Sequence, residues 1–86
     1  MKFNIIIATC TYPELNDAIS KSIKIASTCD TIVRLKVIKD TGKIDPWYGN
    51  TYNVHTKCTI SKNSQPDEIK KYIDKMFSKG NVKRGC

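Results

Sequence analysis

The sequence lacks the residue patterns of a metal centre and of the common enzyme classes. Its four cysteines, Cys10, Cys29, Cys58 and Cys86, are far apart and never spaced Cys-x-x-Cys, and the chain has a single histidine. Structural zinc sites use closely spaced ligand pairs, so we expect no bound metal and no other cofactor. The chain also has no glycine-rich phosphate loop and no pair of carboxylates placed for acid–base chemistry. We therefore expect a protein that is not an enzyme.

Long apolar runs are missing as well. The run from Ile5 to Ala8 is far too short for the apolar region of a secretory signal, and no span approaches the length of a membrane helix. Without a secretory signal, the thiols are expected to stay reduced. We therefore expect a cytoplasmic protein that does not associate with membranes.

Acidic residues are scarce relative to basic ones. Lys and Arg total 15 against 8 Asp and Glu, which gives a formal charge of +7 in a chain of 86 residues. Such a field attracts polyanions, namely nucleic acid, an anionic membrane surface or an acidic protein. The alternative is that the excess charge only keeps the chain soluble. The length suits one small domain, which buries a modest share of its surface, so we expect a dimer.

Apolar periodicity predicts the element order strand, helix, strand, strand, helix. The expected strands cover residues 2–8, 31–43 and 52–61, and the expected helices cover 11–27 and 64–79. In the central strand Val33, Leu35 and Val37 form the buried row, and the Asp-Thr-Gly sequence at 40–42 predicts a turn. Each helix opens on Ser or Thr, with an acidic residue three positions later and a proline between them, as in a capping box.

These elements predict a two-layer fold. A right-handed crossover through the first helix makes the first two strands parallel and leaves room for the third between them. The predicted class is α+β, a βαββα ferredoxin-like sandwich with a three-stranded antiparallel sheet of order 1-3-2 and both helices on one face. Residues 1–80 form the single domain, and 81–86 form a short basic tail. We expect Ile6 on the outer face beside Ile38, and an open edge on the first strand that invites a second copy.

The main functional candidate is the sheet face opposite the helices. Arg34 and Lys36 alternate with the buried row of the central strand, and His55 and Lys57 share one face of the third strand. Contacts between such cations and phosphates supply affinity, little sequence reading and a steep salt dependence. Other basic residues at strand ends and in the tail extend the positive area. The predicted nucleic-acid-binding residues are Lys2, Arg34, Lys36, Lys39, Lys43, His55, Lys57, Lys83 and Arg84.

Two further features have more than one interpretation. Trp47 and Tyr48, with Tyr52 nearby, either stack on unpaired bases or fold over the end of the sheet to close the core. We favour the core for Trp47, because a lone tryptophan in a small domain is commonly structural. His55 could join Lys57 and a tyrosine in a ribonuclease-like site, but a histidine without a recognisable acid–base partner is more often a surface residue.

Several general features together resemble the small basic counter-defence proteins of large-genome bacteriophages. They are the opening Met-Lys-Phe-Asn-Ile-Ile-Ile, the basic strand at Arg34 and Lys36, the Lys83–Arg84 tail, and a composition rich in Ile, Lys and Asn. Within that set the chain is similar in size and charge to the TifA-like suppressors of the ToxIN toxin–RNA defence system. The resemblance implies a cytosolic RNA-binding dimer that engages the toxin's RNA and so blocks the ribonuclease toxin. It assigns no site residue.

We therefore favour a noncatalytic RNA-binding protein, encoded by a phage, that inhibits a host RNA-dependent defence system as an antitoxin. The RNA preference comes from the resemblance and the basic sheet. One alternative is an inhibitor that uses the same basic face on an acidic host protein. The other is a small ribonuclease that uses His55.

Overall fold

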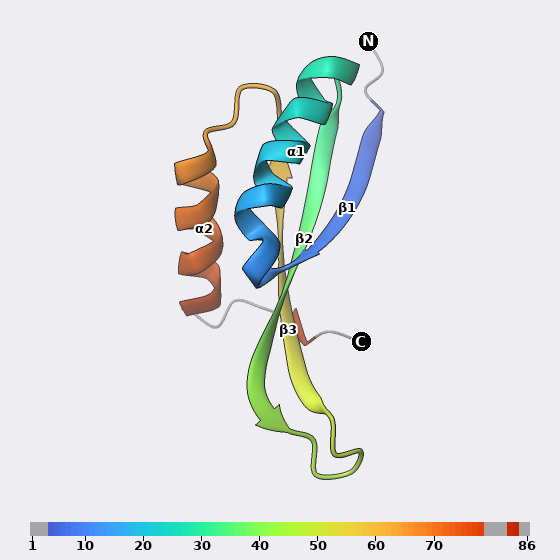
Figure 1. Cartoon of the computed structure of the whole chain (residues 1–86), viewed down its shortest axis with the longest axis vertical. Helices are drawn as coiled ribbons and strands as arrows, with labels where there is room; N and C mark the ends of the chain where they lie inside the picture. Colours follow the sequence, from blue (N-terminus) through green and yellow to red (C-terminus); the bar gives the residue numbers. More distant parts are fainter. Residues whose placement is uncertain (1–3, 79–82, 85–86) are drawn as a thin grey trace.

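A mixed β-sheet runs the length of the molecule, and two helices cover one face of its upper part (Figure 1). The computed structural model describes residues 4–78 and 83–84. The elements in chain order are β1 (Ile5–Thr11), the 3-10 turn η1 (Tyr12–Glu14), α1 (Leu15–Cys29), β2 (Ile32–Ile44), β3 (Thr51–Ile60), α2 (Pro66–Ser78) and β4 (Lys83–Arg84). The molecule measures 48 × 23 × 20 Å, because β2 and β3 continue well past the helices. Within the described residues, no helix is long and apolar enough to cross a membrane.

The strand order in the sheet is β1-β2-β3-β4. β1 pairs with β2 in parallel, from Ile5 opposite Ile32 to Thr11 opposite Ile38, whereas β3 pairs antiparallel with both β2 and β4. The predicted α+β class with two helices is confirmed, but the antiparallel ferredoxin-like sheet of order 1-3-2 is wrong. β2 carries the row of fully buried valines and leucine, so it takes the position that has a partner strand on each side. β3 therefore lies outside β2 rather than between β1 and β2.

The core lies between the sheet and the two helices. Val33, Leu35 and Val37 of β2 are at most 1% exposed and meet the apolar stripes of α1 and α2. The buried apolar residues are Cys10, Leu15, Ile19, Ala26, Val33, Leu35, Val37, Ile60, Ile69 and Ile73.

The start of α1 follows the predicted capping box. Glu14 Oε2 accepts hydrogen bonds from the backbone N–H of Thr11, at 3.4 Å, and from its hydroxyl, at 3.0 Å. A single 3-10 turn precedes the α-helix. The helix ends at Cys29, slightly later than predicted, where Asp30 is left-handed (φ 48°) and donates its N–H to the carbonyl of Ala26.

The predicted phase of the first strand is wrong. Ile6 lies opposite Val33 beneath the helices, whereas Ile5 and Ile7 face outward with 51% and 78% of their side chains exposed. Three consecutive isoleucines carry no alternation of polarity, so the sequence does not specify which of them is buried.

The predicted turn at residues 40–42 is a bulge within β2. The register with β3 shifts between Asp40 and Ile44, and the strand continues to Ile44. Gly42, at φ 75°, donates its N–H to Asp40 Oδ1 at 2.8 Å, and the hydroxyl of Thr41 donates to the carbonyl of Tyr52 at 3.0 Å. The turn chemistry is therefore present, but the bond to the neighbouring strand keeps the ladder going.

Candidate nucleic-acid interface

The candidate site lies on the sheet face opposite the helices, which we call the outer face. Two rows of Cα partners cross it, one formed by Ile7, Arg34 and Thr59 and the next by Thr9, Lys36 and Lys57. Partners in a row point to the same face, and alternate residues along β2 are buried under the helices. Both rows therefore project away from the helices.

Arg34, Lys36 and Lys57 form a compact group of cations on this face, called the cationic cluster below. Lys36 and Lys57 are directly opposite each other across β2 and β3, and Arg34 is the next outward residue of β2. Together with Ile7 of β1, the three cations line a shallow hollow of about 170 Å³. The structure thus brings these three side chains together, as the alternation of the two strands predicted.

The cationic cluster has no acidic partner among the described residues. Among the described residues, the ion pair joins Lys62 Nζ to Asp30 Oδ1, at 3.4 Å, in the loops after β3 and α1. It involves no member of the cationic cluster. Like charges at directly opposite positions of two strands are destabilising. An anion bound between Lys36 and Lys57 would remove this repulsion, and phosphate oxygens can accept hydrogen bonds from several cations at once.

His55 lies on the outer face as well, further along β3 than Lys57. Its Cα partners are Ile38 of β2 and Lys83 of β4, and its side chain is half-buried. The predicted grouping of His55 with the cations is therefore correct as a matter of position. Its row places an isoleucine, rather than another titratable side chain, opposite it on β2.

Lys39, by contrast, is not on the outer face. Its backbone lies opposite Val54, and its Nζ stands 4.8 Å from the ring centroid of Tyr12 and 5.4 Å from that of Phe77, at the end of the helical layer. The hydroxyl of Tyr12 donates a hydrogen bond to Asp74 of α2, which together with burial and the carboxylate charge raises the pKa of Tyr12. Lys39 therefore joins η1, α2 and β2 through cation–π contacts instead of extending the basic face.

The remaining predicted basic residues are Lys2, Lys43, Lys83 and Arg84. Lys43 is exposed within the bulge of β2, between Asp40 and Ile44, and lies well away from the cationic cluster. Lys83 and Arg84 form β4, which brings the backbone of this segment against β3 at His55 and Val54. Lys2 lies outside the described residues.

A second candidate is the hairpin that extends below the helices in Figure 1, here named the β2–β3 arm and comprising residues 39–54. At its tip, Asp45 Oδ1 accepts the backbone N–H groups of Trp47 and Tyr48, at 2.7 and 3.1 Å. Trp47 is 88% exposed and Tyr48 is 80% exposed. The prediction that Trp47 closes the core is wrong, because the paired strands carry it past the end of the helical layer, where there is no core to join.

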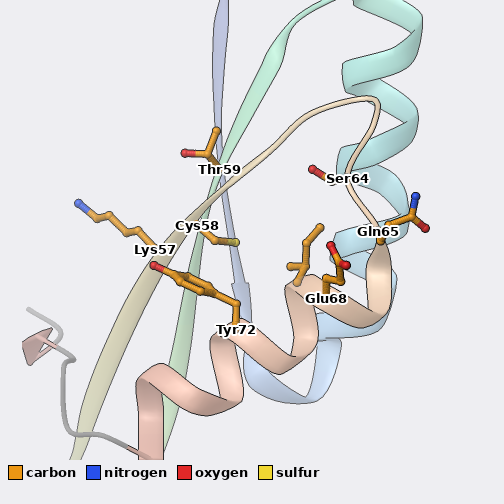
Figure 2. A pocket seen from close by; sticks show the side chains of 8 residues that line it. Lys57, Cys58, Thr59, Ser64, Gln65, Glu68 and Tyr72 are labelled. Atoms are coloured by element: carbon orange, nitrogen blue, oxygen red, sulfur yellow. The ribbon is translucent and has the colours of Figure 1, made fainter.

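The sequence did not indicate a hollow of about 410 Å³ between the edge of β3 and α2. Figure 2 shows Tyr72 reaching from α2 toward β3, whereas Lys57 points away from the helix. The lining residues are Lys57, Cys58, Thr59, Ser64, Gln65, Glu68, Ile69 and Tyr72. Burial, and to a smaller extent the charge of Cys10, raises the pKa of the Cys58 thiol to about 11. Cys58 is therefore protonated at neutral pH and is a poor nucleophile.

Similarity to known proteins does not assign this chain to a family. No family model matches it, and neither a curated protein nor a solved structure is significantly similar to it. The cationic cluster offers positive charge with no acidic partner in the described part of the chain, the arm offers exposed rings, and the hollow beside α2 offers a protonated thiol and hydroxyl groups.

Proposed function

We propose that the protein binds a nucleic acid, preferably RNA, by placing its phosphates on the outer face. The observation that carries the proposal is the direct opposition of Lys36 and Lys57 with Arg34 beside them and no acidic partner among the described residues. A sheet that served only for solubility would have no reason to place like charges across from each other, because the arrangement costs stability. A phosphate bound between Lys36 and Lys57 would relieve their repulsion, and this relief would add to the binding free energy.

The proposed binding is noncatalytic. The number of phosphates that the cationic cluster contacts determines how steeply the affinity depends on salt. Each phosphate neutralised on a single strand releases counterions and contributes about −0.7 to the slope of log K against log salt concentration. Contacts from the three members of the cationic cluster therefore correspond to a slope of about −2. Binding of this kind reads the backbone and not the bases, so it supplies affinity before any sequence preference.

We further propose that the bound RNA belongs to a host toxin–RNA defence system, and that the protein acts in the host cytoplasm as a phage-encoded antitoxin. This role, the preference for RNA over DNA and the involvement of a host toxin protein all come from the resemblance to TifA-like suppressors. The basic outer face supports it, because an RNA component of such a system is a polyanion of the kind this face suits.

We further propose that the protein forms a homodimer through β1. β1 is the edge strand of the sheet, and its sequence Ile-Ile-Ile-Ala-Thr-Cys-Thr contains no charge and no proline. Natural edge strands usually carry such features to prevent pairing with another strand. Pairing between two copies of β1 would extend the sheet and place two cationic clusters on one continuous surface.

The test is a binding titration of wild type and two matched double variants against RNA, single-stranded DNA and duplex DNA over a salt series. Arg34→Glu with Lys36→Glu reverses the charge of the cluster, while Lys21→Glu with Lys24→Glu makes the same change in formal charge on α1, on the other side of the sheet. We expect the cluster variant to lose RNA affinity at least tenfold more than the α1 variant, with RNA bound more tightly than DNA.

A structural control separates lost binding from lost folding. In the cluster variant a carboxylate at position 36 would face Lys57, so the circular dichroism spectrum and the free energy of unfolding should match those of wild type or improve slightly. Equal affinities of the two double variants would contradict the proposed site. Absence of binding to every nucleic acid at low salt, together with capture of an acidic host protein, would favour the protein-inhibitor alternative, to which Ile7 beside the cluster lends an apolar contact.

A further inference from the structure

The tip of the β2–β3 arm carries the most exposed large aromatic side chains among the described residues. Trp47 and Tyr48 are adjacent in sequence, and Ile44 beside them is 68% exposed. Rings of this size dominate core and interface energetics because they bury large areas, so two of them held in solvent on a projecting hairpin indicate a binding surface.

The tip has a defined conformation. Besides the two hydrogen bonds from Trp47 and Tyr48 to the Asp45 carboxylate, the backbone N–H of Asp45 donates to the carbonyl of Asn50 at 2.7 Å, and Gly49 donates to the carbonyl of Asp45 at 2.9 Å. Gly49 has φ 74°, a conformation that glycine adopts without strain. The rings are therefore presented from a fixed turn, which lowers the entropic cost of binding.

Charge distinguishes the arm from the outer face. Residues 39–54 contain two lysines, Lys39 and Lys43, and two aspartates, Asp40 and Asp45, so the arm has no net charge. Both aspartates accept backbone N–H groups of their own turns, and Lys39 lies over aromatic rings of the helical layer. A neutral surface of exposed rings is suited to the faces of bases rather than to phosphates, and the carboxylate at the tip disfavours insertion among lipid chains.

The two surfaces are joined by the same pair of strands. Lys36 and Ile44 are separated along β2 by a span that, at about 3.3 Å per residue, corresponds to roughly 26 Å. At about 3.4 Å per stacked nucleotide, a strand that touches both the cationic cluster and the tip extends over roughly eight nucleotides. Bases in a duplex are already stacked on one another, so rings at the tip can stack only on unpaired bases.

We propose that Trp47 and Tyr48 stack on unpaired bases of a single-stranded RNA whose phosphates lie on the outer face. The inference rests on the proposed function and narrows its ligand to single-stranded RNA that is long enough to reach both surfaces. Phosphate contacts supply the salt-dependent part of the affinity, and stacking supplies a part that depends on the presence of bases.

Trp47 is the only tryptophan in the chain, so it reports on its own surroundings. The probes are an oligouridylate of about twelve nucleotides, inorganic polyphosphate with a similar number of phosphates, and vesicles that contain phosphatidylserine. We expect oligouridylate to quench Trp47 emission and to protect it from acrylamide, and we expect polyphosphate to bind without either effect. Vesicles should leave the emission unchanged.

Variants of Trp47 separate stacking from general apolar contact. Trp47→Leu should weaken oligouridylate binding about tenfold and leave polyphosphate binding within twofold of wild type, whereas Trp47→Phe should retain most of the affinity. Because the side chain is exposed, all three proteins should have the same thermal midpoint.

The possible negative results contradict different proposals. Unchanged Trp47 emission, or equal affinity of Trp47→Leu and wild type for oligouridylate, overturns the stacking inference, while loss of RNA binding in the Arg34→Glu, Lys36→Glu variant still upholds the proposed function. Failure of wild type to bind either RNA or polyphosphate overturns both. A shift of Trp47 emission produced by vesicles alone would assign the arm to a lipid surface and would also contradict the inference.

Discussion

β2 and β3 pass through two different environments along their length. Comparing the two shows which part of the strands belongs to the core and which part is exposed to solvent. Under α1 and α2 the inner row of β2 is fully buried, with Leu35 at its centre, and the outer row carries the cationic cluster. Beyond Lys39, which still contacts rings of the helical layer, the same strands have no helices over them in the β2–β3 arm, and Ile44 and Trp47 are exposed. The covered part therefore stabilises the fold, and the arm extends exposed side chains beyond the helices, although both belong to one hydrogen-bonded ladder.

The largest expected difference between these parts concerns stability. Leu35→Ala leaves a cavity at the centre of the core and should lower the free energy of unfolding by about 2–4 kcal/mol. Ile44→Ala on the same strand is the matched control and should change it by less than about 0.5 kcal/mol. Urea unfolding followed by circular dichroism measures both. Similar losses for the two variants would show that the arm contributes to the core after all.

A smaller difference should arise from alkaline pH. The Cys58 thiol has its pKa raised to about 11, chiefly by burial, whereas the unfolded thiol titrates near 9.0. The folded state therefore keeps this proton longer, and its stabilising effect is complete below pH 9 and is lost as pH rises toward 11. We expect wild type to lose about 1–2 kcal/mol more than Cys58→Ala over this interval in urea unfolding at each pH. Parallel curves for the two proteins would contradict the assignment.

The smallest effect is expected at the tip of the arm. Trp47→Ala removes a side chain that is 88% exposed, so the free energy of unfolding should change by no more than about 0.5 kcal/mol. Unfolding must be followed by circular dichroism, because the variant has no tryptophan. A loss above about 1 kcal/mol would mean that the ring packs against the protein in solution and would remove the basis of the stacking inference.

The sequence predicted those parts of the fold that depend on local patterns. The alternation around Leu35 identified the buried row of β2 and the outward direction of Lys36, and the spacing of Thr11 and Glu14 identified the start of the first helix. It could not give the strand order, because pairing of β1 with β2 depends on long-range contacts rather than on either strand alone. The predicted phase of β1 was wrong because Ile5, Ile6 and Ile7 are equally apolar, so alternation gives no signal there.

For the candidate site, predictability followed the same division. Arg34, Lys36 and Lys57 were found because strand alternation is a two-residue rule. Lys39 was misplaced because it was grouped with the basic residues at strand ends. The same alternation, continued along β2, puts it with the buried row rather than on the outer face. Trp47 was misassigned because an aromatic residue suits a core and an exposed turn equally well, and the distance from the helices decides between them.

The parallel pairing of β1 has a consequence for the order in which the chain folds. β2 and β3 are neighbours in sequence and can form their hairpin within microseconds, whereas the parallel pairing of β1 with β2 spans the whole of α1 and is expected to form more slowly. During synthesis β1 emerges first and is the strand that waits longest for its partner. Its uncharged, isoleucine-rich segment therefore stays unpaired until β2 is available, and exposed apolar strands of this kind are prone to aggregate.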